Sequence, residues 1–323
     1  MPSGEDDLIA RYFKPLATDP GALGLVDDAA VLAASRDDLV LTTDAIVEGV
    51  HYLPGDPPRA IARKALRVNL SDLAAKGATP AGFLLTLALR SADERFLAPF
   101  AQALGEDAAL FDCPLLGGDT VSTPGPMMIS ITAIGRVPPG RMVRRNTLCA
   151  GDRILVTGTI GDSALGLDLL QGANADISDE HRAFLIDRYR VPQPRLALAQ
   201  AIRDHAGAAM DVSDGLAGDL AKMCAASGVT AILDAAAVPL SAAAQAMISG
   251  EPAKLARVLG GGDDYELLCG VAAQQLDPFL AAAQRIGVSV SVIGSAEAGT
   301  GAPRWRDAEH RDIALSGLSY SHF

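Results

Sequence analysis

Apolar residues follow two alternating patterns along the chain, one typical of β-strands and the other of α-helices. In the first part of the chain, continuous apolar runs predict strands at 39–47, 82–90 and 126–137. Apolar residues at spacings of three and four predict helices at 8–16, 57–78 and 94–111. The second of these helices has Pro57 at its start and Gly77 near its end, and both residue types commonly bound helices.

The alternation begins again after residue 152. Further strands are predicted at 153–158, 229–234, 265–271 and 288–294, and a strand leading into aspartate within 207–216. Helices are predicted at 162–172, 194–205, 217–227 and 277–287. The intervening segment 138–152 combines proline, glycine and clustered arginine with weak periodicity, so we place a domain boundary there. The chain of 323 residues is therefore expected to form two α/β domains, at 1–137 and 138–323.

Composition and charge narrow the class of protein. Hydrophobic residues make up 49% of the chain and aromatic residues only 4%, so the cores are expected to consist mainly of Ala, Leu, Val and Ile. The chain carries 39 acidic and 27 basic residues, a net charge of -12. This balance argues against a nucleic-acid partner, because such proteins neutralise phosphates with basic side chains. An anionic substrate would need divalent cations beside it.

Neither a secretory leader nor a membrane span is expected. The first residues lack a basic stretch followed by an apolar one, and no segment runs 18 residues without a charge. We therefore expect a cytoplasmic protein without a membrane partner. The four cysteines lack the spacing of a zinc site or a disulfide framework, which predicts buried reduced thiols at Cys113, Cys149, Cys224 and Cys269.

Aspartates recur where apolar runs give way to turns, as in "VLTTD", "PLLGGD" and "AAMDVSD". Each one alone also fits a turn residue or a helix cap. As a converging set, their carboxylates would repel one another unless cations lay between them. Oxygen ligands with few histidines or cysteines favour Mg²⁺, whose usual companion is a phosphate chain. The set comprises Asp27, Asp28, Asp44, Asp72, Asp119, Asp211, Asp214, Asp263 and Asp264.

The P-loop, dinucleotide-binding and protein-kinase motifs are absent, so a phosphoryl-transfer enzyme would be of another type. From residue 8 onward the chain contains, in order, the motifs "LIARYF", "DDAAVL", "TTDAIVEGVHYLP", "ARKALRVNLSDLAAKGATP", "LLGGDT", "VTGTIGDSALGL", "MDVSDGL" and "GGDDYELL". As a set, these motifs closely resemble the thiamine-monophosphate kinase family. The resemblance implies a two-domain fold like that of aminoimidazole ribonucleotide synthetase, with an N-terminal sheet that pairs across a homodimer and a C-terminal α/β sandwich. It also implies ATP-dependent phosphorylation of thiamine monophosphate to thiamine diphosphate with Mg²⁺.

The resemblance also implies roles for single residues. The metal ligands would be Asp27, Asp28, Thr42, Asp44, Asp72, Asp119, Asp211 and Asp214. The nucleotide contacts would be Thr43, Gly118, Asp119, Arg145 and Ser213, and the thiamine-side contacts His51 and Asp263. Among these, the residues expected to act in catalysis are Asp27, Asp72, Asp119, Asp214 and Arg145.

Several readings of the residues stay open. Lys64 and Lys76 are interpreted as solvated helix charges rather than phosphate contacts. Near the C-terminus the family often has an aromatic residue where this chain has Gly317, which leaves Tyr320 or Trp305 as substitutes. The alternative functions are an ATP-dependent enzyme of the same superfamily with another acceptor, and a catalytically silent metal-binding protein. The absence of any cysteine before Cys113 argues against a selenophosphate synthetase.

Overall fold

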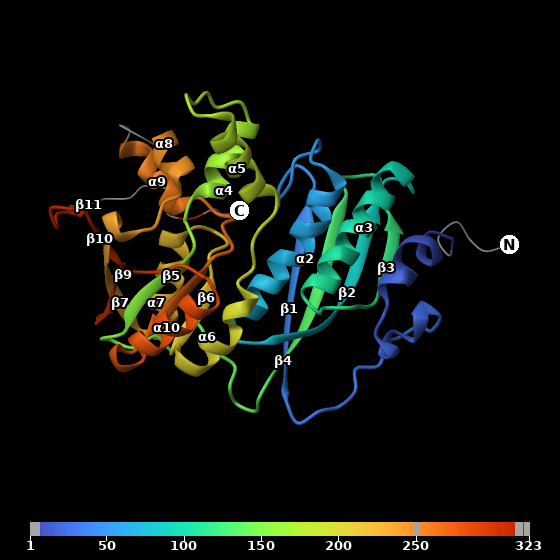
Figure 1. Ribbon diagram of the computed structural model, residues 1–323, viewed down its shortest axis with the longest axis horizontal. Coiled ribbons are helices and arrows are strands. Elements are labelled where there is room, and N and C mark those ends of the chain that lie inside the picture. The colour runs from blue at the N-terminus through green and yellow to red at the C-terminus, as the bar shows by residue number, and fades with distance from the viewer. Residues whose placement is uncertain (1–6, 249–251, 314–318, 320–323) are drawn as a thin grey trace. The chain divides into compact units, whose positions relative to one another are not determined.

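The computed structural model describes residues 7–248, 252–313 and 319, which fall into two compact units. Unit 1 contains Met1–Leu73 and Ala78–Arg141, and unit 2 contains Ala74–Gly77 and Met142–Phe323. Each unit holds one β-sheet and its own helices (Figure 1). The mixed helix and strand content confirms the predicted α/β class.

Unit 1 is a four-stranded sheet with two long helices (Figure 1). The strands are β1 (Asp38–Val47), β2 (Thr79–Leu89), β3 (Leu115–Ser122) and β4 (Met128–Val137), in the order β1-β4-β2-β3. Strands β2 and β3 are parallel and joined through helix α3 (Glu94–Leu110), whereas β4 is antiparallel to both β1 and β2. Helix α2 (Pro58–Ala75) connects β1 to β2. Each of the strands and long helices expected between residues 39 and 137 is therefore confirmed.

The two faces of the unit 1 sheet differ in polarity and burial. Side chains alternate along each strand, so Val40 and Ile46 of β1 point to the same face as Asp44, and both are buried. Leu39 and Leu41 point to the opposite face and are exposed, as is Leu84 of β2. We call this second face the open face. The N-terminal segment 9–25 forms short π and 3₁₀ turns, rather than one amphipathic helix over 8–16.

Unit 2 is a seven-stranded sheet in the order β11-β10-β7-β9-β5-β8-β6. The strands are β5 (Arg153–Thr157), β6 (Ala208–Asp211), β7 (Val229–Asp234), β8 (Leu267–Val271), β9 (Val290–Ala298), β10 (Arg304–Arg306) and β11 (Asp312–Ile313). The α-helices are α4 (Asp162–Leu170), α5 (Asp179–Arg190), α6 (Ala199–His205), α7 (Leu216–Ser227), α8 (Ala242–Ile248), α9 (Pro252–Gly260) and α10 (Leu276–Arg285).

Two hydrophobic clusters form the core of unit 2, and alternation along the central strands separates them. Ile154 and Val156 of β5 belong to one cluster, which also contains buried residues of α4, α5, α7, α8 and α9. Leu155 belongs to the other, with residues of α6 and α10. Helices therefore pack on both faces of this sheet, which confirms the predicted α/β sandwich.

Some elements and one cysteine differ from the expectation. Helix α5 was not predicted, because its sequence "DEHRAFLIDRYR" is dominated by charged residues and shows no continuous apolar stripe. The helix expected from residue 194 starts as a 3₁₀ turn at Leu196–Leu198. Cys149 is exposed, so the prediction of a buried thiol is wrong there, while the other three cysteines are buried. Within the described residues, no helix combines the length and apolarity needed to cross a membrane.

Candidate functional site

A cavity of about 680 Å³ in unit 1 gathers part of the predicted site. Its walls include Asp27 and Asp28 from the N-terminal segment and Gly118 and Asp119 from β3. Asp119 lies opposite Thr86 of β2 in register, and both line the cavity. The tertiary structure thus brings together two predicted ligand groups that are about ninety residues apart in the sequence.

Gly118 is required in this wall by the closeness of the neighbouring strand. A Cβ atom added at Gly118 would lie 1.9 Å from the carbonyl oxygen of Leu85, so any side chain would displace the β2–β3 pairing. Gly118 therefore has no side chain because β2 approaches so closely, and its backbone lines the cavity beside Asp119.

The remaining unit 1 ligands divide between the two faces of the sheet. The hydroxyl of Thr132, which lines the cavity, donates to the Thr43 hydroxyl at 3.1 Å, so Thr43 belongs to the open face. Thr42 points the other way, and its hydroxyl donates to the Asp72 carboxylate on α2. The backbone N–H of Asp44 donates to Asn69 on the same helix at 3.0 Å. The oxygen donors predicted around β1 therefore form two sets, one on each face of the sheet.

His51 is fixed in the turn that follows β1. Its Nδ1 accepts the backbone N–H of Val47 at 3.0 Å, so a neutral ring carries its proton on Nε2. Its carbonyl oxygen accepts the ammonium group of Lys64 at 2.8 Å. Lys64 is only 1% exposed, so the interpretation of this lysine as a solvated charge is wrong. Lys76 likewise donates to the carbonyl oxygen of Ala209 at 2.9 Å.

In unit 2, the predicted residues lie on the loop between β6 and α7. Asp211 is buried at the end of β6, and Ser213 and Asp214 follow it in the loop. A buried residue absent from the predictions, Asp219 on α7, accepts the backbone N–H groups of Ser213 and Asp214 at 3.0 and 2.9 Å. Burial raises the pKa of Asp219, and hydrogen bonding to Lys222 opposes that rise.

The loop that carries Asp263 is hydrogen-bonded directly to this segment. The backbone N–H of Asp263 donates to Ser213 at 2.8 Å, and that of Tyr265 donates to Val212 at 2.9 Å. Asp263 and Tyr265 both have positive φ values, 69° and 51°, which non-glycine residues rarely adopt. A Cβ atom added at Gly262 would lie 2.3 Å from the Ser213 carbonyl oxygen. Ser213, a predicted nucleotide contact, and Asp263, a predicted thiamine-side contact, thus lie on two loops that are joined by hydrogen bonds.

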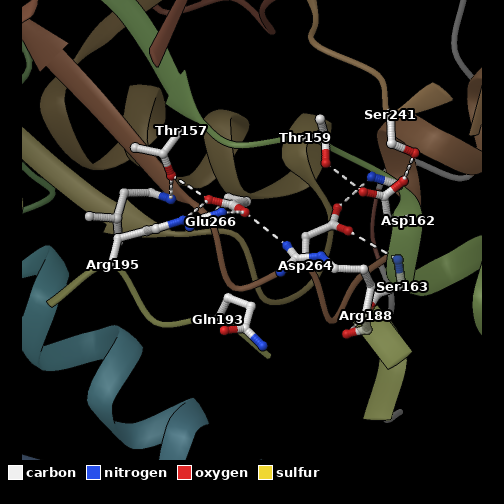
Figure 2. Close-up of polar contacts among 12 residues, drawn as sticks. Thr157, Thr159, Asp162, Ser163, Arg188, Gln193, Arg195, Ser241, Asp264 and Glu266 are labelled. Atoms are coloured by element: carbon white, nitrogen blue, oxygen red, sulfur yellow. Dashed lines mark hydrogen bonds and ion pairs between the residues drawn. The ribbon is translucent and has the colours of Figure 1, made fainter. Parts of the chain in front are cut away.

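A buried polar network supports the Asp263 loop (Figure 2). The carboxylate of Glu266, which is fully buried, accepts hydrogen bonds from Thr157, Arg188 and Arg195. Two arginines on one carboxylate compensate the cost of burying its charge. Asp264 lies beside this group and accepts the backbone N–H of Gly161 at 2.8 Å, at the start of α4. The backbone of segment 158–166 therefore binds one of this chain's own carboxylates.

Arg145 and the predicted aromatic substitutes occupy different surroundings. Arg145 is exposed, and its carbonyl oxygen accepts the Ser227 hydroxyl at 3.2 Å, which ties this segment to the end of α7. Trp305 is 4% exposed within the core of unit 2, so its assignment as a substrate-facing aromatic is wrong. Tyr320 and Gly317 lie outside the described residues.

The donor set fits a hard divalent cation. Among the described residues, no group of three or more His, Cys, Asp or Glu side chains is arranged to hold a metal ion by itself. The predicted donors are carboxylates and hydroxyls only, the ligands that Mg²⁺ prefers. Because Mg²⁺ is commonly held by one or two carboxylates together with substrate phosphates and waters, Asp28 and Asp119 on the cavity wall suit an ion that arrives with a nucleotide.

Sequence comparison finds relatives along the whole chain. Residues 26–137 match the N-terminal domain of AIR synthase related proteins, and residues 150–305 match the C-terminal domain. The chain is 44% identical to the thiamine-monophosphate kinase of Caulobacter vibrioides, over 99% of this chain and 91% of that protein. It is 40% identical to the thiamine-monophosphate kinase of Escherichia coli, over 100% of this chain and 99% of that protein.

Solved structures share the fold. The crystal structure of thiamine-monophosphate kinase from Stenotrophomonas maltophilia superposes with a TM-score of 0.82 at 37% identity, covering 94% of this chain and 95% of that one. AaThiL complexed with AMPPCP and TMP gives a TM-score of 0.78 at 29% identity, covering 94% and 97%. These matches confirm the predicted two-domain fold.

The buried Asp264 predicts a pH dependence of stability. Burial raises the pKa of this carboxyl well above its ordinary value, so the folded chain binds a proton more tightly there than the unfolded chain does. Its contribution to the free energy of unfolding therefore falls as pH rises above about 4, the ordinary pKa of an aspartate. Replacing Asp264 with Asn removes that dependence, so the stability of wild type relative to D264N should decrease from pH 4 towards neutrality in urea unfolding series.

Asp307 provides a control of opposite sign for the pH series. Hydrogen bonds from the backbone and side chain of Arg311 lower the pKa of this partly exposed carboxyl. The stability of wild type relative to D307N should therefore be flat or rise slightly with pH. Parallel curves for D264N and wild type would show that Asp264 titrates as it does in the unfolded chain.

Proposed function

Because the chain belongs to the thiamine-monophosphate kinase family, we propose that it transfers the γ-phosphoryl group of ATP to thiamine monophosphate, forming thiamine diphosphate and ADP. AaThiL, which is similar over nearly the whole chain, is complexed with AMPPCP and TMP. The observation that carries the proposal in this chain is the placement of Asp27, Asp28 and Asp119 around one cavity, beside the bare backbone of Gly118.

We assign the nucleotide phosphates to the oxygen-rich surfaces of the two units. Mg²⁺, when bound, would neutralise part of the phosphate charge. The residues proposed to hold it are Asp27, Asp28, Thr42, Asp44, Asp72, Asp119, Asp211 and Asp214. The nucleotide itself would contact Thr43, Gly118, Arg145 and Ser213. An exposed guanidinium such as that of Arg145 is suited to phosphate oxygens, since it offers a fixed fork of donors.

We assign no residue as a general base, because the acceptor does not need one. A phosphate monoester has a second pKa near 6, so thiamine monophosphate is already a largely deprotonated nucleophile at neutral pH. The enzyme must mainly align two anions and reduce their repulsion, which favours direct in-line transfer. His51 is proposed as a substrate contact rather than a covalent carrier. Its Nδ1 lone pair is engaged by Val47, and the protonated Nε2 can donate a hydrogen bond to a substrate.

We further propose that residues 1–137 carry ATP and Mg²⁺ binding and dimerisation, and that residues 138–323 form the C-terminal α/β domain. Support for a homodimer comes from the open face of unit 1, where Leu39, Leu41, Leu84 and Val121 expose apolar surface. An apolar sheet face of this kind is typically covered by a partner. The cytoplasmic location and the absence of a nucleic-acid partner remain predictions from composition.

The proposed activity predicts ADP release that requires both thiamine monophosphate and Mg²⁺. Asp119→Asn should reduce kcat by about a hundredfold or more, because a neutral amide replaces an anionic ligand beside the phosphates. Asp37→Asn, an exposed change outside the cavity, should retain wild-type turnover. ADP release without the acceptor would favour another superfamily activity, and no release with it would favour a silent metal-binding protein.

Direct transfer predicts inversion at phosphorus. ATP made chiral at the γ-phosphorus should give thiamine diphosphate of inverted configuration, as a single displacement requires. His51→Ala should raise the KM for thiamine monophosphate several-fold while transfer continues. Net retention of configuration, or labelled protein isolated after ATP alone, would establish a phosphoenzyme and overturn the in-line proposal.

The homodimer proposal predicts that a charge on the open face separates the subunits. Leu41 is 65% exposed on β1, and Leu41→Glu should shift the light-scattering mass from two chains to one. Leu110, which is 67% exposed at the end of α3, provides a matched control. Leu110→Glu should leave the mass of two chains unchanged. A wild-type mass of one chain over a wide concentration range would contradict the proposal.

A further inference from the structure

Lys222 on α7 links the proposed metal ligand Asp214 to the buried carboxylate of Asp219. The Lys222 ammonium group pairs with Oδ2 of Asp214 and lies 2.9 Å from Oδ1 of Asp219. Lys222 is 42% exposed and Asp214 35%, whereas Asp219 is only 1% exposed. A partly exposed cation is therefore fixed by one accessible carboxylate and one buried carboxylate.

The two oxygens of Asp219 have separate partners. Oδ2 accepts the backbone N–H groups of Ser213 and Asp214, and so holds the loop before α7 in place. Oδ1 accepts the ammonium group of Lys222. Loss of the lysine would leave both backbone hydrogen bonds intact. The loop geometry and the charge beside Asp214 are therefore controlled by different contacts.

The position of Lys222 places a positive charge where a metal ion would bind. A cation that coordinates Oδ2 of Asp214 would compete with the ammonium group for that oxygen and push it away, because two positive charges repel each other at this distance. Lys222 can remain paired with Asp219 when it yields Asp214, so the displacement does not leave either charge without a partner. The displaced ammonium group would still lie close to the ion and repel it.

We propose that Lys222 is an internal counter-cation for Asp214 and lowers the divalent-cation affinity of this loop. The lysine would keep Asp214 neutralised until a metal ion arrives with its nucleotide. This inference rests on the proposed function, in which Asp214 is a metal ligand. It assigns Lys222 to the control of metal affinity, and it makes Asp219 a positioning residue for Ser213 and Asp214.

The test measures metal binding directly, using Mn²⁺ as an EPR-active probe on the full chain without nucleotide. Lys222→Gln removes the positive charge but keeps a donor for Asp219, and should tighten Mn²⁺ binding by roughly five- to twentyfold through loss of partly screened repulsion. Lys222→Met should act in the same direction and serves if the glutamine variant does not fold. Lys222→Arg keeps the charge and should bind Mn²⁺ like wild type.

Asp214→Asn separates this proposal from the proposed function. It should weaken Mn²⁺ binding, and Lys222→Gln should have no further effect when added to it, as expected for a coupled pair. If Asp214→Asn weakens binding but both charge-removing lysine variants bind Mn²⁺ no more tightly than wild type, the counter-cation role is wrong and the metal ligand stands. If Asp214→Asn leaves Mn²⁺ affinity unchanged, Asp214 is not a ligand and both proposals fail at this residue.

Discussion

Local compensation of carboxylate charge is the constraint on which the site of this protein depends. A chain with a net charge of -12 that is to bind phosphates cannot leave converging aspartates without partners. The fold provides a different partner for each of three buried carboxylates of unit 2. Glu266 receives two arginines, Asp264 receives backbone N–H groups at the start of α4, and Asp219 receives backbone N–H groups together with Lys222.

These buried carboxylates connect stability to function because they hold the loops that carry the exposed ones. The loop with Asp263 is held by Asp264 and Glu266 on either side of the strained Tyr265, and it is hydrogen-bonded to the segment with Ser213. Positive φ at non-glycine residues costs free energy and persists only where surrounding contacts fix it. A substitution of Asp264 or Glu266, which hold these loops, should therefore alter substrate or metal binding before it unfolds unit 2.

The two faces of the unit 1 sheet carry different members of the predicted site. Strand alternation sends Thr42 and Asp44 towards α2, and Thr43 towards the cavity and the open face. Sequence proximity indicated one cluster around Asp44, but adjacent strand residues point to opposite sides. Predicted ligands therefore lie on both sides of the edge strand β1.

Lys64 and Cys149 show where local sequence was a poor guide to burial. A lysine on an amphipathic helix is usually solvated, yet Lys64 is buried because its ammonium group binds the carbonyl oxygen of His51, thirteen residues earlier in the chain. A cysteine is usually buried, yet Cys149 is exposed. Helix α5 was missed since its charged residues obscure the few apolar positions, such as Leu185, that contact the core.

The sequence by itself determined the class of fold and the long strands and helices of unit 1, and it predicted the carboxylates of the proposed site. Those features can be predicted from periodicity and composition, because both reflect the burial of each short segment. Only the tertiary structure decided which carboxylates share a surface. Asp28 and Asp119 line one cavity because β3 lies beside the N-terminal segment, and Lys222 meets Asp214 because Asp219 holds the loop before α7 by its backbone N–H groups. Such contacts depend on how distant or looped segments are placed, which no local pattern records.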